Sequence, residues 1–245
     1  MNIVLLLTGT VNPGGMSMTA LNDTAVRESQ YVDSINYWAN YSEIKIVFVE
    51  NSGCDFSNKV NSHILSKKLE FFCFNGNTYD KNLGKGLGEL SCIEFALLYS
   101  TFLKENPFIF KVTGRYKVLN FDTFLHYIKK NERVDLMVDL KLNLTFADSR
   151  FFGFKKEFIN EYLLNYKNIL NDSESVYFEN ILTKATLVAV SNGYSYTAMP
   201  DLPRICGFSG SLGKEFKSNY IHWMKHRFKY YLKFKSFGLG HMPDF

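Results

Sequence analysis

The chain opens with the apolar run Ile3-Val4-Leu5-Leu6-Leu7 and, directly after it, the loop Thr8-Gly9-Thr10-Val11-Asn12-Pro13-Gly14-Gly15. A continuous apolar run of this kind is typical of a strand that is buried on both faces, as in a parallel sheet. The loop that follows is rich in turn formers. Three further strands are predicted at Ile44–Val49, which is a second buried run, at Leu69–Phe74 and at Phe108–Tyr116.

Predicted helices separate these strands. They cover Asp23–Trp38, Ser57–Lys67 and a segment that begins at Gly84 and runs to about Leu103. Strands that alternate with helices predict right-handed crossovers and an α/β fold, in which a mostly parallel, Rossmann-type sheet is flanked by helices. Ligands bind such sheets at the carboxyl ends of the strands. The rule points to the loops at Thr8–Asn12, at Glu50–Gly53 and at Arg115.

The second half of the chain is less regular. Helices are expected at Phe121–Lys130, Lys155–Leu170 and Glu174–Ala185, short strands at Leu136–Leu140, Leu187–Val190 and Tyr194–Met199, strand or loop at Thr145–Phe154, and a glycine-rich loop at Pro203–Gly213. We expect one domain over residues 1–217, with a donor half over about 1–120 and an acceptor or catalytic half over about 121–217. A basic, aromatic C-terminal helix and tail would follow over residues 218–245.

The composition is that of a folded globular protein, with 46% hydrophobic and 21% charged residues, and it argues against disorder. The four cysteines form no C-x-x-C pair, so neither a zinc site nor a disulfide framework is expected. The N-terminus lacks a basic segment, and no apolar run has the length of a membrane span. We therefore expect a soluble, cytoplasmic protein.

The net charge of +4 is concentrated near the C-terminus. Between His222 and Lys235, basic residues alternate with aromatic ones, a pattern that suits nucleic acid or an anionic membrane surface. The rest of the chain carries no nucleic-acid motif. We therefore expect no nucleic-acid partner and peripheral contact with the cytoplasmic face of the inner membrane, although a solvated helix would show the same pattern.

Two segments are the first candidates for binding. Gly84-x-Gly86-x-Gly88 lacks the dinucleotide spacing G-x-G-x-x-G, and no Walker loop occurs. The segment either begins a helix that needs glycine or binds a phosphate at the helix N-terminus, where Lys85 would assist. Glu50 and Asn51 end the second strand, where they either accept hydrogen bonds from a base or ribose or form a polar turn.

Charged side chains in apolar surroundings are the next candidates. Lys111 and Arg115 belong to the fourth strand, and an arginine there binds pyrophosphate bidentately unless it pairs with a structural carboxylate. Asp148 and Arg150 lie among aromatic residues, so they either pair with each other or face the site. Glu179 lies in a predicted helix with aromatic neighbours and is the candidate general base.

A Gly/Ser loop follows Arg204 and contains Ser209. Its backbone N–H groups would bind phosphate, or the loop would be a lid or a simple turn. The spacing of Gly207-Phe208-Ser209-Gly210 does not match a serine-hydrolase elbow. The five histidines show no metal-ligand spacing.

These segments follow one another in the order of a known family. They are Thr8-Gly9-Thr10, Glu50-Asn51-Ser52, Gly84-Lys85-Gly86-x-Gly88-Glu89, Lys111-x-Thr113-Gly114-Arg115-Tyr116 and Arg204-Ile205-x-Gly207-x-Ser209-Gly210-Ser211-x-Gly213. Over most of residues 1–215 the chain resembles small bacterial glycosyltransferases from O-antigen and capsule gene clusters, which have the nucleotide-diphospho-sugar (GT-A) fold.

The resemblance implies transfer of a sugar from a nucleoside diphosphate donor, with UDP as the expected nucleotide, to a lipid-linked or growing surface polysaccharide such as O-antigen lipopolysaccharide or capsule. Glu179 would be the catalytic base, and in a retaining reaction Glu179 or Asp148 would flank the anomeric carbon. The donor would be bound by residues from several parts of the chain: Thr8, Gly9, Thr10, Asn12, Arg27, Glu50, Asn51, Lys85, Lys111, Arg115, Arg150, Arg204 and Ser209.

One departure from the family bears on the cofactor. Where the family carries an Asp-x-Asp that holds a divalent metal, Mg²⁺ or Mn²⁺, this chain has Thr113-Gly114-Arg115. We name no metal ligand, and metal dependence stays open. Arg115 and Lys111 would neutralise the diphosphate instead.

Two other functions are open at this point. A sugar-phosphate nucleotidyltransferase can have the same sheet, but its Gly-rich loop with Arg and Lys directly after the first strand is absent here. A non-catalytic nucleotide-sugar-binding module would have lost the metal motif in the same way.

Overall fold

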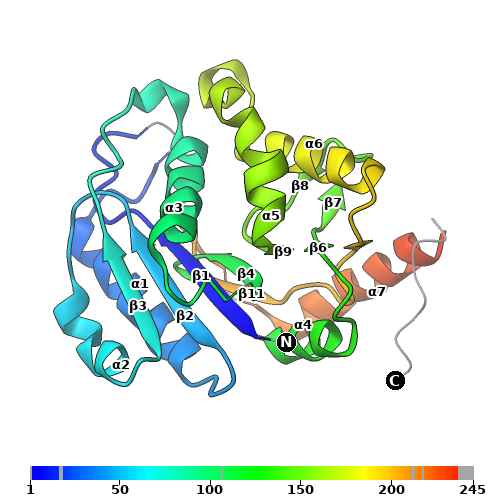
Figure 1. The fold of residues 1–245 in the computed structure, drawn as a ribbon, viewed down its shortest axis with the longest axis horizontal. Coiled ribbons are helices and arrows are strands. Elements are labelled where there is room, and N and C mark those ends of the chain that lie inside the picture. The colour runs from blue at the N-terminus through cyan, green and yellow to red at the C-terminus, as the bar shows by residue number, and fades with distance from the viewer. Residues whose placement is uncertain (1, 17–18, 106, 211–212, 217, 237–245) are drawn as a thin grey trace.

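The structure of the protein is a computed structural model that describes residues 2–16, 19–105, 107–210, 213–216 and 218–236, with the backbone alone for 233–236. Two expected features extend beyond the described residues, the glycine-rich loop at Ser211-Leu212 and the tail at 237–245. The fold is the predicted mixed α/β fold, with a 7-stranded, mostly parallel sheet flanked by helices (Figure 1).

The N-terminal half of the chain builds the parallel part of the sheet. β1 (Ile3–Gly9) pairs in parallel with β2 (Lys45–Glu50) on one side and with β4 (Phe108–Thr113) on the other, and β3 (Leu69–Cys73) lies beyond β2. Every residue of β1 is buried. A strand covered on both faces can be apolar throughout, which is why this run was recognisable from the sequence.

The second half of the chain completes the same sheet. β9 (Phe151–Lys155) lies between β4 and β6 (Leu136–Met137) and is antiparallel to both, while β10 (Tyr196–Thr197) pairs in parallel with β6. The strand order is β10-β6-β9-β4-β1-β2-β3. Both halves therefore share one sheet, and their division into a donor half and an acceptor half stays a prediction.

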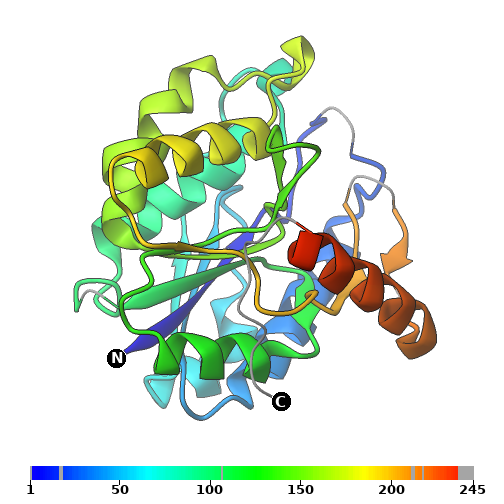
Figure 2. The ribbon, with the colours of Figure 1, turned by 90° about the vertical axis from the view of Figure 1, so that its right-hand side faces the viewer.

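Helices cover both faces of the sheet. In Figure 2 the sheet is seen nearly edge-on, with α3 and α6 above it and α1 and α4 below it. α1 and α4 meet through the rings of Trp38 and Phe121, whose centroids are 5.0 Å apart. The α-helices are α1 (Thr24–Ala39), α2 (Asn61–Leu65), α3 (Lys85–Tyr99), α4 (Phe121–Lys130), α5 (Lys156–Phe158), α6 (Phe178–Ser191) and α7 (Tyr220–Ser236), with 3₁₀ turns at Ser57–Val60, Lys81–Leu83, Leu164–Ile169 and Asp172–Glu174 and a π turn at Ile159–Leu163.

The predicted strand Phe108–Tyr116 breaks at Gly114. The Gly114 N–H donates to the Thr8 carbonyl oxygen at 2.8 Å, and a Cβ at position 114 would lie only 2.7 Å from that oxygen. After the break, β5 (Tyr116–Val118) leaves the main sheet and pairs antiparallel with β11 (Ile205–Phe208). β11 pairs in turn with β12 (Glu215–Phe216), so the loop expected at Pro203–Gly213 is partly a strand.

Three helix and strand predictions in the second half were wrong in detail. Leu187–Val190 is not a strand but part of α6, because a short β-branched run does not by itself distinguish a strand from a helix. The helix expected over Lys155–Leu170 is divided into α5, the π turn and a 3₁₀ turn. The helix expected from Glu174 begins at Phe178.

A strained turn joins β7 (Leu140–Lys141) to β8 (Phe146–Ala147), which form a separate 2-stranded sheet. The φ angles of Leu142, Asn143 and Leu144 are 48°, 56° and 63°. Left-handed backbone brings the Cβ of an L-residue against a carbonyl oxygen, so a run of three such residues is rare. Leu142 is also 69% exposed.

α7 contacts the domain through one of its faces (Figure 2). Arg227 Nε donates to Asp201 Oδ1 at 2.7 Å, and Trp223 Nε1 donates to the Leu202 carbonyl oxygen at 3.1 Å. No helix in the described part of the chain is both long enough and apolar enough to span a bilayer. Apolar side chains of α7 that remain exposed are Ile221, Met224, Phe228 and Leu232.

Candidate functional site

A cleft of about 330 Å³ lies at the carboxyl ends of β1 and β4. These two strands are neighbours in the sheet, which extends through β2 on one side and through β9 on the other. Loops diverge at such a switch in strand order and leave room for a ligand. The described residues that line the cleft are Thr10, Pro13, Met16, Thr19, Arg27, Tyr79, Lys85, Glu89, Thr113, Arg115, Tyr116, Ser149, Arg150, Glu179, Ser209, Gly210 and Phe216.

Two buried arginines, Arg27 of α1 and Arg115 after β4, lie side by side in the cleft wall, 5% and 7% exposed. Arg27 Nε donates to the Thr10 carbonyl oxygen at 2.8 Å, and its Nη1 to the Leu21 carbonyl oxygen at 3.0 Å. Arg115 Nη1 donates to Gln30 Oε1 at 3.2 Å. Among the described residues, neither guanidinium forms an ion pair.

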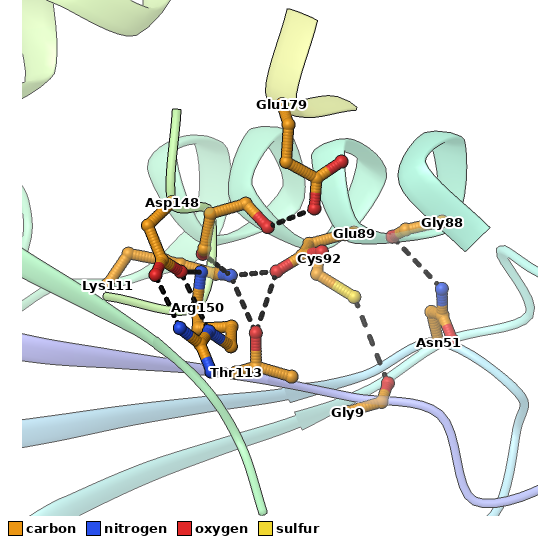
Figure 3. Close-up of polar contacts among 11 residues, drawn as sticks. Gly9, Asn51, Gly88, Glu89, Cys92, Lys111, Thr113, Asp148, Arg150 and Glu179 are labelled. Carbon is orange, nitrogen blue, oxygen red and sulfur yellow. Dashed lines mark hydrogen bonds and ion pairs between the residues drawn. The ribbon is translucent and has the colours of Figure 1, made fainter. Parts of the chain in front are cut away.

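Glu179 reaches the cleft from α6, above the sheet in Figure 3. Its Oε1 accepts a hydrogen bond of 2.7 Å from Ser149 Oγ. The Ser149 carbonyl oxygen accepts a bond of 2.8 Å from Lys111 Nζ, which also donates to Thr113 Oγ1 at 3.0 Å and forms an ion pair with Glu89 of α3 (Figure 3). A chain of polar contacts therefore joins the two carboxylates of the cleft, Glu179 and Glu89.

Lys111 does not line the cleft. Its side chain is fully buried beneath the cleft, held by Glu89, Thr113 and Ser149. Burial lowers the pKa of Lys111 to about 7, although the negative charges of Glu179 and Asp148 act in the opposite direction. Its predicted contact with a donor stays a prediction, but in this structure its ammonium group holds Glu89 and Ser149.

Asp148 and Arg150 pair with each other, which was one of the two alternatives. Arg150 Nε donates to Asp148 Oδ1 at 2.8 Å, and Lys141 Nζ donates to Asp148 Oδ2 at 2.7 Å. Burial would raise the pKa of Asp148, but the hydrogen bond and charge of Arg150, together with those of Lys141, hold it well below its ordinary value. Arg150 also lines the cleft, whereas Asp148 is set back behind it.

Glu50 and Asn51 support the loop after β1. Glu50 is fully buried, and its Oε1 accepts the Val11 N–H at 2.8 Å while its Oε2 accepts the Ser52 N–H at 2.9 Å. Asn51 Oδ1 accepts from Thr10 Oγ1 at 2.7 Å. These contacts are those of the polar-turn alternative, and a nucleoside contact for either residue stays a prediction.

The glycines at the start of α3 are accounted for by packing. Gly84 has a φ of 85°, and a Cβ there would collide with the Asp172 carboxyl group. Asp172 is hydrogen-bonded to the Lys85 backbone at this helix end. Burial raises the pKa of Asp172 above its ordinary value, although the Lys85 charge and this hydrogen bond act in the opposite direction. A protein carboxylate thus occupies the helix start, while the Lys85 side chain lines the cleft.

The remaining predicted donor-binding residues divide into two groups. Thr10 and Ser209 line the cleft. Arg204 instead donates from Nε to Ser218 Oγ at 2.7 Å and lies over the Tyr220 ring. The others that do not line the cleft are Thr8, Gly9 and Asn12.

Glu89, Ser149 and Tyr79 line the cleft without having been predicted as site residues. Glu89 follows Lys85 by one helical turn, and this spacing could have placed both on one face of α3. Ser149 lies between Asp148 and Arg150, but nothing in the sequence distinguishes a serine that orients a carboxylate from any other loop serine.

The cleft does not fit a divalent cation. Mg²⁺ and Mn²⁺ prefer oxygen ligands, especially carboxylates. The strand end offers Thr113 and Arg115, and Glu89 is already paired with Lys111. Among the described residues, no three His, Cys, Asp or Glu side chains are grouped so that they could hold a metal ion.

No protein-family model matches the chain, and neither does any curated protein. Solved structures similar to it include one from Desulfovibrio desulfuricans described as a nucleotide-diphospho-sugar transferase (8% identity, TM-score 0.46, covering 81% of this chain and 80% of that one). Staphylococcus aureus TarS 1–349 in complex with UDP is similar at 15% identity and TM-score 0.47, covering 81% of this chain and 58% of that one.

A cytidylyltransferase from Leptospira borgpetersenii is also similar, at 10% identity and TM-score 0.41, covering 83% of this chain and 77% of that one. The TarS fragment is longer than this chain, which covers 58% of it, little more than half of its length. At these identities and TM-scores the likeness assigns no activity.

Proposed function

We propose that the protein is a glycosyltransferase that transfers a sugar from a nucleoside diphosphate, with UDP as the expected nucleotide, to a hydroxyl group of a glycan. The observation that carries the proposal is the composition of one cleft, which contains the Glu179 carboxylate and two buried arginines that form no ion pair with any described residue. Sugar transfer needs a base for the acceptor hydroxyl and positive charge for the leaving diphosphate. The resemblance of the strand-end segments to O-antigen and capsule glycosyltransferases supports the same function.

Glu179 is the proposed base, and its contacts support that role. Its Oε1 accepts from Ser149, and its Oε2 has no hydrogen-bond partner among the described residues. In the proposed step, the carboxylate takes the proton of the acceptor hydroxyl while that oxygen attacks the anomeric carbon. The bond from the anomeric carbon to the diphosphate oxygen breaks, and the diphosphate leaves with the electron pair.

The acceptor is proposed to be a lipid-linked or growing surface polysaccharide, reached at the cytoplasmic face of the inner membrane. The exposed apolar side chains of α7, such as Ile221 and Phe228, support this placement, as do the exposed Lys225 and Lys229. An amphipathic helix with basic residues binds anionic lipid surfaces.

The test is incubation with a panel of nucleotide sugars, with release of the nucleoside diphosphate and transfer to a lipid-extract acceptor measured in parallel. Glu179→Gln should lower transfer by roughly 10²- to 10⁴-fold and leave nucleotide binding unchanged, because only proton transfer is removed. Glu174→Gln is the matched control, since Glu174 is exposed and lies outside the cleft lining.

Three outcomes contradict the proposal. If Glu179→Gln transfers sugar at the full rate, Glu179 is not the catalytic base. Release of pyrophosphate from a nucleoside triphosphate and a sugar phosphate, without glycan product, identifies a nucleotidyltransferase. Binding of nucleotide sugars with neither hydrolysis nor transfer identifies a binding module.

A further inference from the structure

Arg27 and Arg115 are an unusual pair because both are more than nine-tenths buried and neither has a carboxylate partner among the described residues. Buried charges in proteins are normally paired. The Arg27 guanidinium donates to carbonyl oxygens and forms no direct ion pair with a described carboxylate. Burial lowers the pKa of Arg27 and the nearby charge of Arg115 lowers it further, while Tyr31 and the charge of Glu50 act in the opposite direction. The two guanidinium groups therefore repel each other inside the cleft wall.

Arg115 is also incompletely bonded. Among the described residues its buried Nε has no hydrogen-bond partner, while Nη1 donates to Gln30 and the guanidinium lies 5.6 Å from the centre of the Tyr31 ring. An unpaired buried donor costs about 1–3 kcal/mol, and more for a charged group.

Gly210 keeps the space between the two arginines open. A Cβ at position 210 would collide with Arg115 Nη2 and lie 3.4 Å from Arg27 Nη1. The Gly210 carbonyl oxygen accepts the Ala20 N–H at 3.0 Å, which joins the hairpin of β11 and β12 to the loop after β1. Two segments far apart in the sequence thus meet at the arginine pair.

We propose that Arg27 and Arg115, on either side of Gly210, bind the diphosphate of the donor and do so without a divalent cation. The inference rests on the proposed function and deepens it. Planar guanidinium groups bind phosphate oxygens bidentately, and two of them match the two phosphates of a diphosphate. In the proposed site Arg27 is the second cation, since Lys111, which was predicted from the sequence for that role, is paired with Glu89.

The experiment is calorimetric titration of the full chain with UDP and with inorganic pyrophosphate, each in EDTA and in Mg²⁺. Affinity in EDTA should equal that in Mg²⁺ within about twofold. Arg115→Gln should weaken binding of both probes by roughly 10- to 100-fold, because bonds to a charged group are lost. Arg133→Gln is the control, since Arg133 is exposed and lies outside the cleft lining.

Gly210→Ala tests the geometry without removing a charge. The added methyl group displaces the Arg115 guanidinium, so pyrophosphate affinity should fall about tenfold. Arg27 also supports the loop after β1, so Arg27→Gln is interpreted only with its thermal melting midpoint measured beside it. Arg115→Gln and Gly210→Ala should melt within about 4 °C of the unaltered protein.

The outcomes separate this inference from the proposed function. Binding of UDP only with Mg²⁺, or unchanged affinity in Arg115→Gln, overturns the arginine site even if sugar transfer is observed. Metal-free pyrophosphate binding that depends on Arg115 supports the site even if no nucleotide sugar is consumed.

Discussion

The Asp148 carboxylate gives the protein a specific response to acid. Arg150 and Lys141 hold its pKa in the folded protein below the ordinary value of 3.8. The folded state therefore binds this proton less readily than the unfolded state, and the resulting stability is present above about pH 4 and lost as the pH falls below it. Asp148→Asn should lower the free energy of unfolding at pH 7 by roughly 1.5–3 kcal/mol, a difference that shrinks below about pH 4.

Urea unfolding followed by circular dichroism at several pH values measures this difference. The control is Asp33→Asn, which changes an exposed carboxylate on α1. Equal acid sensitivity of the unaltered protein and Asp148→Asn would show that the Asp148 cluster does not supply this stability.

Single residues of the cleft were predictable to different degrees. Arg115 follows a buried strand, and strand ends meet at one edge of a parallel sheet, so its place at the cleft could be predicted. Glu50 likewise ends a buried strand, yet its carboxylate accepts hydrogen bonds from backbone N–H groups. The pattern fixes where a strand ends but not which partners a side chain finds. The pairing of Arg115 with Arg27 depends on how α1 packs, which no local pattern encodes.

Among the structural elements, the turn from Leu142 to Leu144 is under backbone strain. Glycine adopts positive φ without the Cβ clash, whereas a leucine there costs about 1–2 kcal/mol. Leu142→Gly should therefore raise the free energy of unfolding by about 0.5–1 kcal/mol, because relief of the clash exceeds the added entropy of the unfolded chain. Leu142 is 69% exposed, so little apolar burial is lost.

Leu65→Gly is the matched control for this prediction. Leu65 is 74% exposed but lies in α2 with helical backbone, where glycine costs roughly 0.5–1 kcal/mol. Thermal and urea unfolding of both variants should shift in opposite directions. A loss of stability in both would mean that the Leu142 backbone is not strained.

Elements were predictable where one physical signal dominated. Apolar runs identified β1, β2 and β4 because these strands are buried along most of their length, whereas β3 is an edge strand in which only Leu69 is buried. The break at Gly114 was not visible, because it depends on the carbonyl of Thr8 in a neighbouring strand. The π turn at Ile159–Leu163 likewise depends on tertiary packing, which overrides local helix propensity.

For the molecule as a whole, α7 makes a prediction about membranes. Vesicles that contain anionic phospholipid should bind the full chain, and neutral vesicles should bind it far more weakly. Because a lysine near an anionic surface contributes about 1 kcal/mol, Lys225→Ala with Lys229→Ala should weaken binding about 30-fold at low salt. Co-sedimentation over a lipid titration measures the change.

The control for charge is Lys104→Ala with Lys130→Ala, which removes two exposed lysines outside α7. A second variant, Ile221→Ser with Phe228→Ser, tests the apolar contribution of the exposed face. Equal sedimentation of all these proteins would leave α7 as a solvated helix and contradict membrane docking.

The position of β9 in the sheet affects the chain while it is still being made. β4 ends at Thr113, and its partner on the open side, Phe151–Lys155, emerges from the ribosome about 40 residues later, which at roughly 5–20 residues per second takes about 2–8 s. During that interval β4 presents an unpaired, aromatic-rich edge, which is a template for pairing with another nascent chain. A gene truncated after residue 120 would therefore yield aggregate, and the first half of the chain depends on the timely arrival of a short antiparallel strand from the second.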